Sequence, residues 1–149
     1  MIDVFKEGLF RVTKKYGNIV MLYGDEGVFP VGNFFQFFAD RSFNLGLGRQ
    51  NLVSAACGFI VRGKLPIILG ESSLAFAATA QIRDNICIPN LNVKFVVAGS
   101  NSGSNDFSDM EIIKSMPNIK VMCPKNDEEM LIDLEEMVGT YRPVYFRLM

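Results

Sequence analysis

Residues 40–83 read DRSFNLGLGRQNLVSAACGFIVRGKLPIILGESSLAFAATAQIR, and this stretch decides the fold class. Residues 42–45 are a short candidate strand, and the residues that follow predict a helix over 49–62 with a glycine after it. Residues 65–69 form an unbroken apolar run, which is typical of a strand buried on both faces. A second helix is expected over 72–88, closed by a proline. The stretch is therefore two successive strand–helix units.

The same alternation continues on both sides of this stretch. Upstream, apolar positions at helical spacing predict a first helix that ends near Tyr16–Gly17, and residues 19–23 predict a buried strand. Asn126, with Glu129 three residues later, is typical of a capping box at the start of a helix. The remaining predicted elements are strand 93–98, helix 107–116, strand 119–123, helix 126–138 and strand 144–148.

Alternation of strands and helices over the whole length predicts one α/β domain spanning residues 1–149. Such a pattern is typical of a mostly parallel sheet with helices on both faces, which is a three-layer αβα arrangement. No internal repeat, low-complexity tract or linker is present in the sequence, so a division into two domains has no support.

The sequence contains no histidine. Histidine is the usual general base near neutral pH and the commonest metal ligand, so Ser-His-Asp, Cys-His and histidine–metal sites are excluded within this chain. Cys57, Cys87 and Cys123 lie far apart and form no CxxC pair, which favours reduced, buried thiols. We predict no metal site.

Charge and hydropathy exclude two further classes of partner. The 15 basic and 16 acidic residues nearly cancel, so no strongly basic field exists to hold a nucleic acid or an anionic membrane. The longest uncharged run, residues 27–39, is shorter than the roughly 20 residues that cross a bilayer. Charges recur through residues 1–15, unlike the layout of a signal peptide. We expect a cytoplasmic protein.

Two loops have features of nucleotide-binding motifs. Gly46 and Gly48 lie between a short strand and a helix, as in a dinucleotide fingerprint, but Asn51 stands where the third glycine belongs. Residues 99–103 form a polar loop after a strand without the Gly-Lys-Ser/Thr of a P-loop. A nucleotide-binding regulatory domain is therefore a minor alternative.

The four phenylalanines of residues 34–38 are the densest aromatic cluster. They are interpreted first as a core or helix-packing surface. The alternative is a face that a partner chain covers, since small monomers seldom expose such a patch.

Three segments together resemble the pyrimidine-binding domain of transketolase and of the related deoxyxylulose-phosphate synthase. The first is the stretch 40–83. The second, residues 90–130, reads NLNVKFVVAGSNSGSNDFSDMEIIKSMPNIKVMCPKNDEEM, and the third, residues 142–148, reads RPVYFRL. The order of these motifs is specific, and the resemblance covers nearly the whole chain.

The resemblance implies a unit that contacts the aminopyrimidine ring of thiamine diphosphate. In that family a separate domain holds the diphosphate and a divalent metal, and a third domain follows. We expect both to be absent here, because Gly24-Asp25-Glu26-Gly27 is not the family's Gly-Asp-Gly motif. Thiamine diphosphate is therefore expected only with a partner, which is either a separate diphosphate-binding chain or a second copy of this chain.

One departure from the family lies at its catalytic acid. The family segment reads like NVGIAEQN, and its Glu hydrogen-bonds a pyrimidine nitrogen to promote the amino–imino shift. The matching position here is Arg49, followed by Gln50. A guanidinium is always cationic and only donates hydrogen bonds, so Arg49 cannot share that proton as a carboxylate does. No catalytic residue is therefore assigned at this position.

The other departures concern the rest of the pocket. Two aromatic positions of the family's TFAxF segment fall on Glu71 and Leu74, and the substrate-facing His of its DGPTH segment falls within residues 104–108, which contain no histidine. The resemblance thus makes Arg49, Gln50, Glu71 and Leu74 the candidate cofactor-binding positions. Arg49 could pair with Glu71, or its place at a helix N-terminus could accept a small anion such as phosphate.

Two functions follow from the resemblance. In the first, the chain is a transketolase-like subunit with a degenerate thiamine diphosphate site, which serves in an assembly or binds a different ligand. In the second, it is the catalytic half of a split thiamine-diphosphate-dependent ketol transferase, with Glu71 replacing the missing acid. In neither is the chain a complete enzyme alone.

Overall fold

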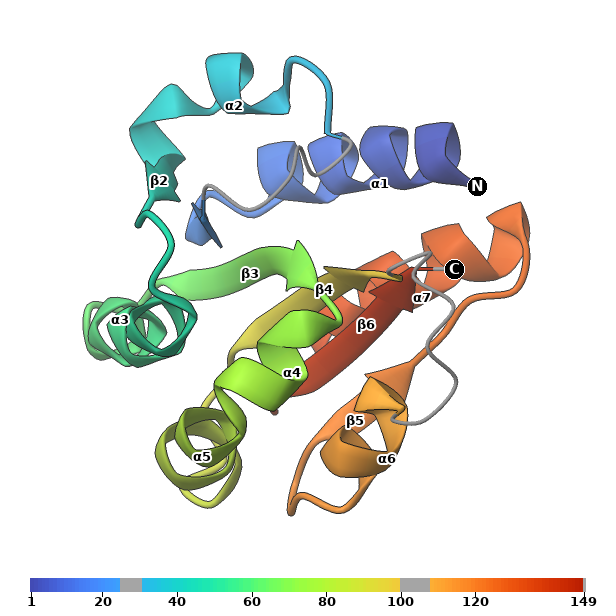
Figure 1. The fold of residues 1–149 in the computed structure, drawn as a ribbon. Coiled ribbons are helices and arrows are strands. Elements are labelled where there is room, and N and C mark those ends of the chain that lie inside the picture. Colours follow the sequence, from blue (N-terminus) through green and yellow to red (C-terminus); the bar gives the residue numbers. More distant parts are fainter. Residues whose placement is uncertain (25–30, 100–107, 149) are drawn as a thin grey trace.

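The computed structural model describes residues 1–24, 31–99 and 108–148. Six strands form a single sheet in the order β2-β1-β3-β4-β6-β5, and every neighbouring pair is parallel (Figure 1). The predicted α/β class with a parallel sheet is confirmed. The strands are β1 (Ile19–Tyr23), β2 (Ser42–Asn44), β3 (Leu65–Glu71), β4 (Lys94–Ala98), β5 (Lys120–Met122) and β6 (Val144–Leu148).

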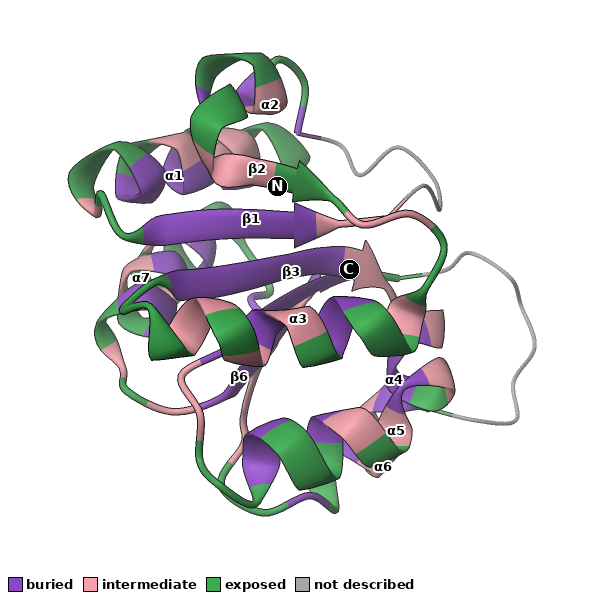
Figure 2. Cartoon of the chain, turned by 90° about the vertical axis from the view of Figure 1, so that its left-hand side faces the viewer, coloured by how far each residue is buried: buried purple, intermediate pink, exposed green. Residues whose placement is uncertain are grey.

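Helices cover both faces of the sheet. Helices α1 and α7 pack together on one face, and α3, α4 and α6 lie on the other (Figures 1 and 2). The helical segments are α1 (Ile2–Lys15), α2 (Phe34–Phe37), the 3-10 turn η1 (Ala39–Arg41), α3 (Arg49–Val61), α4 (Ser73–Ala77), α5 (Thr79–Gln81), the π-helical turn η2 (Ile82–Cys87), α6 (Asp109–Lys114) and α7 (Asp127–Gly139). No helix in the described residues is long and apolar enough to cross a membrane.

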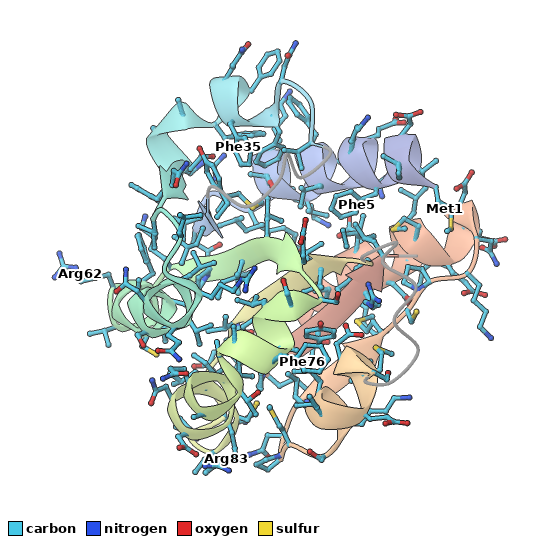
Figure 3. The ribbon with its side chains drawn as sticks, viewed as in Figure 1. Met1, Phe5, Phe35, Arg62, Phe76 and Arg83 are labelled. Atoms are coloured by element: carbon cyan, nitrogen blue, oxygen red, sulfur yellow. The ribbon has the colours of Figure 1, made fainter. Side chains whose placement is uncertain are left out.

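The two faces of the sheet carry two apolar cores. Successive residues of a strand point to opposite faces, so Val96 joins the core under α1 and α7 while Phe95 joins the core under α3 and η2. Phe5 of α1 is fully buried against the first face (Figure 3). Figure 2 shows β1 and β3 buried along most of their length, as their uninterrupted apolar sequences predict.

The order of the strands creates a switch point between β1 and β3. The chain leaves β1 to form β2 on one side, and then crosses to form β3 on the other side. In open α/β sheets, ligands bind at the carboxyl ends of the strands at such a point. The ends of β1 and β3 are therefore where a site is expected.

The predicted helix 72–88 is broken in the structure, and the prediction of one continuous helix was wrong. Ala78 departs from helical geometry, with φ −122° and ψ 25°. The Thr79 hydroxyl donates hydrogen bonds to the carbonyl oxygens of Ala75 (2.6 Å) and Phe76 (3.0 Å). Side chains of this kind compete with the backbone for its acceptors and bend helices.

The aromatic cluster divides between the two interpretations. Phe34 and Phe38 are buried in the core, and Phe35 stacks on Tyr23 with ring centroids 4.1 Å apart. Phe37, in contrast, is 69% exposed. Three of the four rings are therefore mostly enclosed, and the exposed Phe37 ring still meets the edge of the Phe10 ring, with centroids 5.3 Å apart. The helix expected over 107–116 is observed over Asp109–Lys114, and the strand expected over 119–123 is observed over Lys120–Met122.

Candidate functional site

A narrow cavity of about 20 Å³ lies at the switch point. It is formed where the ends of β1 and β3 meet the first turn of α3. Three of the four positions singled out from the sequence, Arg49, Glu71 and Leu74, contribute to its wall. The full lining is Gly24, Gly46, Arg49, Leu52, Leu69, Gly70, Glu71 and Leu74.

Local backbone structure positions Arg49 in the wall. Gly46 has φ +72°, a left-handed conformation that glycine adopts readily, and it turns the chain after β2. Gly48 is the N-cap residue of α3, and its carbonyl oxygen accepts a hydrogen bond from Leu52 N–H at 2.8 Å. Arg49 is consequently the first residue of α3, and its side chain is half-buried.

Glu71 and Leu74 come from the opposite wall. Glu71 is the last residue of β3 and is half-buried, while Leu74 in α4 is only 2% exposed. A Cβ placed on Gly70 would lie 3.3 Å from the Leu74 side chain. The absence of a side chain at Gly70 thus lets α4 pack closely over the end of β3.

Arg49 and Glu71 carry opposite charges on one small cavity. They are neighbours in the wall, and the pairing suggested by the sequence stays a prediction. The cavity therefore combines a cation at the start of α3 with a carboxylate at the end of β3.

Gln50 lies outside this cavity. Its side chain is exposed, and its Nε2 donates a hydrogen bond to the carbonyl oxygen of Ala77 at 3.1 Å. It lines a second, open hollow of about 280 Å³, together with Leu47, Gly48, Arg49 and Ala77. Gln50 thus connects α3 to the end of α4, and among the described lining residues only Arg49 belongs to both hollows.

The cavity, as its described lining bounds it, is too small to take the aminopyrimidine ring of thiamine diphosphate. The cavity has room for about one water molecule, whereas ligand sites usually measure roughly 300–1,000 Å³. Its described lining contains no aromatic ring, and Arg49 places a permanent cation in its wall. Residues 25–27 of the Gly-Asp-Glu-Gly segment, 100–103 and 104–107 lie outside the described residues.

A buried polar cluster that the sequence did not reveal lies near the carboxyl ends of β4 and β6. The Tyr145 hydroxyl donates a hydrogen bond to Asp109 Oδ2 at 2.6 Å, and Arg147 Nε lies 3.0 Å from the same oxygen. Burial, and secondly the hydrogen bond to Asp109, raise the pKa of Tyr145. The cluster attaches the start of α6 to β6, and no local pattern links residues so far apart in the sequence.

The sequence is similar to parts of longer proteins. No protein-family model matches the chain. It is 33% identical to a transketolase C-terminal section from Methanocaldococcus jannaschii, over 97% of this chain and 48% of that protein. It is 28% identical to 1-deoxy-D-xylulose-5-phosphate synthase from Desulfotalea psychrophila, over 97% of this chain and 23% of the synthase. One of the subunits of apulose-4-phosphate transketolase from Actinobacillus succinogenes is 27% identical, over 99% of this chain and 50% of that protein.

Two solved structures share the fold. A split-gene transketolase, an inactive beta4 tetramer, superimposes with a TM-score of 0.86 and 27% identity, over 97% of this chain and 50% of that one. The transketolase of Campylobacter jejuni superimposes with a TM-score of 0.84 and 14% identity, over 98% and 25% of the two chains, which shows the fold alone.

The chain spans about half the length of the split transketolase relatives and about a quarter of the longer enzymes. Sequence and structure agree on the same group of proteins, and the resemblance noted in the sequence is confirmed. The chain is a homologue of the split transketolases and of 1-deoxy-D-xylulose-5-phosphate synthase, with the fold of their pyrimidine-binding domain.

Proposed function

We propose that this chain is a transketolase-like subunit of the pyrimidine-binding type whose thiamine diphosphate site is degenerate. It serves in an assembly with a partner chain, or binds a ligand other than thiamine diphosphate. The observation that carries the proposal is the place of Arg49 in the wall of the cavity at the switch point. The resemblance in sequence matches this position to the family's Glu.

The charge of Arg49 is the physical reason to propose a degenerate site. A carboxylate at this position accepts a hydrogen bond and raises the basicity of the ring that it contacts, whereas a guanidinium has no acceptor atom. Replacing an acid by a permanent cation also reverses the sign of the local field. Glu71, on the facing wall, occupies a position where the family has an aromatic ring. Two of the side chains that the family places against the pyrimidine ring are therefore replaced by side chains of different chemistry.

The relatives support a separate partner chain. Among them are a C-terminal section, one subunit of a transketolase and a split-gene transketolase, and this chain covers about half of each. The partner that we propose first is a diphosphate-binding chain. A homodimer is the other assembly that the sequence suggested.

One observation favours the alternative of a catalytic half of a split ketol transferase. Glu71 supplies a carboxylate to the same cavity as Arg49. In that alternative Glu71 accepts the proton in place of the family's acid, and the diphosphate and metal are held by the partner.

Calorimetric titration distinguishes the two functions. Thiamine diphosphate with Mg²⁺ is titrated into the chain alone, and into its mixture with the product of a neighbouring gene that encodes a diphosphate-binding domain. The variants are Arg49→Glu, the double variant Arg49→Glu/Glu71→Phe, and the control Arg62→Glu. Arg62 is the C-cap residue of α3 and projects away from the cavity (Figure 3).

We expect no binding by the wild type or the control, and binding by the double variant in the mixture. That result would show that Arg49 and Glu71 are the residues that prevent thiamine diphosphate from binding. Binding by the wild type in the mixture would overturn the proposal. If Glu71→Gln then abolished that binding, the catalytic alternative would take its place.

A further inference from the structure

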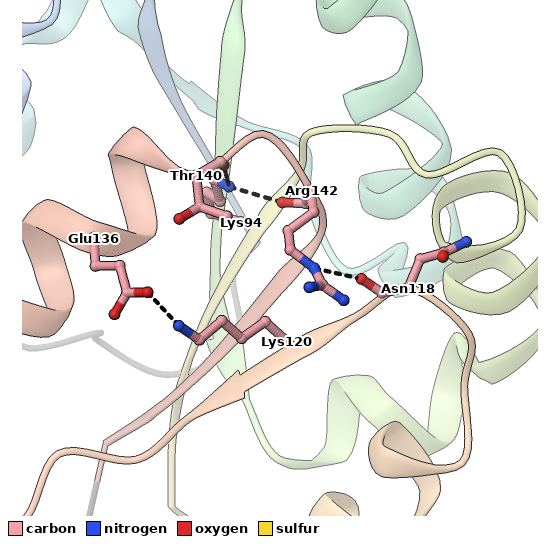
Figure 4. A network of polar contacts seen from close by, with 6 residues as sticks. All are labelled: Lys94, Asn118, Lys120, Glu136, Thr140 and Arg142. Carbon is pink, nitrogen blue, oxygen red and sulfur yellow. Dashed lines mark hydrogen bonds and ion pairs between the residues drawn. The ribbon is translucent and has the colours of Figure 1, made fainter.

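Lys94 is a fully buried lysine at the start of β4, away from the cavity described above. Its Nζ donates hydrogen bonds to the carbonyl oxygens of Thr140 (2.6 Å) and Arg142 (2.8 Å) (Figure 4). Thr140 is the C-cap residue of α7, and both acceptors belong to the turn between α7 and β6. The lysine thus reaches from one strand to a turn 46 to 48 residues away.

No carboxylate pairs with Lys94 among the described residues. On the same turn, the Arg142 side chain donates through Nε to the carbonyl oxygen of Asn118 at 2.8 Å. The nearby acid of α7, Glu136, pairs with Lys120 of β5 (Figure 4). The preceding acid, Glu135, pairs with Lys15 (3.0 Å) and lies 3.8 Å from Arg11, both of α1.

The hydrogen-bond count suits an uncharged amine. A lysine ammonium has three N–H donors, and only two acceptors face Lys94 among the residues that the structure describes. A neutral amine has two N–H groups, which these two carbonyl oxygens satisfy. An ammonium here would bury a charge without a counterion, which costs free energy unless water reaches it.

The turn that Lys94 holds connects three strands. Lys120 N–H donates to the Pro143 carbonyl oxygen (2.9 Å), and Val144 N–H donates to that of Val93 (3.1 Å). These bonds join the starts of β5, β6 and β4 around one short segment. Any opening of the turn would therefore expose the first backbone hydrogen bonds of this side of the sheet.

We propose that Lys94 makes the closure of the α7–β6 turn depend on pH, because the neutral amine holds the turn closed and protonation loosens it. The ammonium can be hydrated only when the turn moves away from β4. This pH-dependent closure rests only on contacts among the described residues of this chain. It is independent of the function proposed above.

Linkage gives the direction of the effect. Burial, and secondly the charge of Arg142, lower the pKa of Lys94 from 10.5 to about 7. Between these values the unfolded chain binds a proton that the folded chain does not, so stability rises with pH. The unfolding equilibrium constant should fall by up to about tenfold per pH unit in this window. Below pH 7 Lys94 is protonated in both the folded and the unfolded chain, so stability no longer changes with pH through this group.

Two measurements on the chain test the proposal. The first follows the Nζ signal of ¹⁵N-lysine-labelled protein by NMR between pH 5 and 10. The second compares amide-exchange protection of Lys120 and Val144 at pH 6 and 8, corrected for intrinsic exchange rates, with that of amides in β1 and β3. Both are repeated with Lys94→Gln, a neutral donor, and with the control Lys120→Gln.

We expect one lysine signal to titrate near pH 7 and to be missing from Lys94→Gln. Protection of the turn should be lower at pH 6 than at pH 8 in the wild type, and independent of pH in Lys94→Gln. If every lysine titrates above pH 10, or if turn protection in the wild type does not change with pH, the proposal is overturned. The NMR titration needs only the wild type, so it decides even if Lys94→Gln fails to fold.

Discussion

A Cβ atom placed on Gly24 would lie 2.5 Å from the carbonyl oxygen of Gly46. Gly24 follows β1, and Gly46 belongs to the turn between β2 and α3. The contact is between two backbones, so no side-chain movement can relieve a clash. This close approach brings the start of α3, and with it Arg49, against the end of β1, and it explains why the cavity is narrow.

Replacing Gly24 by alanine should therefore destabilise the fold at the candidate site. We expect a loss of about 1–3 kcal/mol in the free energy of unfolding, the usual cost of an overpacked position. Urea denaturation followed by circular dichroism measures it. Gly17→Ala is the matched control, because a Cβ there meets no atom within 4 Å. Equal stability of the two variants would contradict the contact.

The sequence predicted features that depend on neighbouring residues better than features that depend on residues far apart in the chain. Strand 144–148 and the capping of α7 by Asn126 were predicted correctly, because apolar runs and capping boxes are local patterns. The break near Thr79 was missed because the bonds of its hydroxyl compete with a helical pattern that is otherwise continuous.

The candidate site was predicted in part, by resemblance. Arg49 and Glu71 do share one cavity, while Gln50 points elsewhere because consecutive helical residues face different directions. The cluster around Asp109 was missed, since nothing local connects it to β6.

Asp109→Asn should be among the most destabilising single changes. The Asp109 carboxylate is 5% exposed, and it holds both the Tyr145 hydroxyl and the Arg147 guanidinium. Removing the carboxylate charge leaves the Arg147 guanidinium, whose side chain is 18% exposed, without its counter-charge, which costs up to about 3 kcal/mol, the lower end of the range for fully buried pairs. Thermal and urea unfolding provide the measurement.

Glu136→Gln serves as the comparison, because its pair with Lys120 is exposed to solvent. Pairs at the surface contribute about 0–1 kcal/mol. A loss for Asp109→Asn no larger than that for Glu136→Gln would show that the cluster is not a structural anchor.

Asn126→Ala should weaken α7 at its first turn. The Asn126 side chain accepts a hydrogen bond from Glu129 N–H at 2.9 Å, and the Glu129 carboxylate accepts one from Lys125 N–H at 2.9 Å. Loss of such a cap costs about 0.5–2 kcal/mol. Asn126→Asp keeps an acceptor at the same place and should retain most of the stability. If both substitutions cost the same in urea unfolding, the cap is not the source of the effect.

The two charges of the cavity should be energetically coupled. In Arg49→Glu, two carboxylates would line a space of about 20 Å³. Like charges raise a carboxyl pKa in the folded state, so this variant should lose stability, relative to the wild type, as the pH rises from about 4 to 7. Adding Glu71→Gln should restore part of it.

A double-mutant cycle at pH 5 and pH 7 measures this coupling, which we expect to be on the order of 1 kcal/mol at pH 7 and smaller at pH 5. The cycle removes the separate contribution of other contacts that Arg49 makes, because these are common to both backgrounds. If the effects of the two substitutions on the free energy of unfolding simply add at both pH values, Arg49 and Glu71 do not interact across the cavity. The proposal that Arg49 and Glu71 together disable the thiamine diphosphate site would then lose support, whereas a coupling that grows with pH would support it without any ligand present.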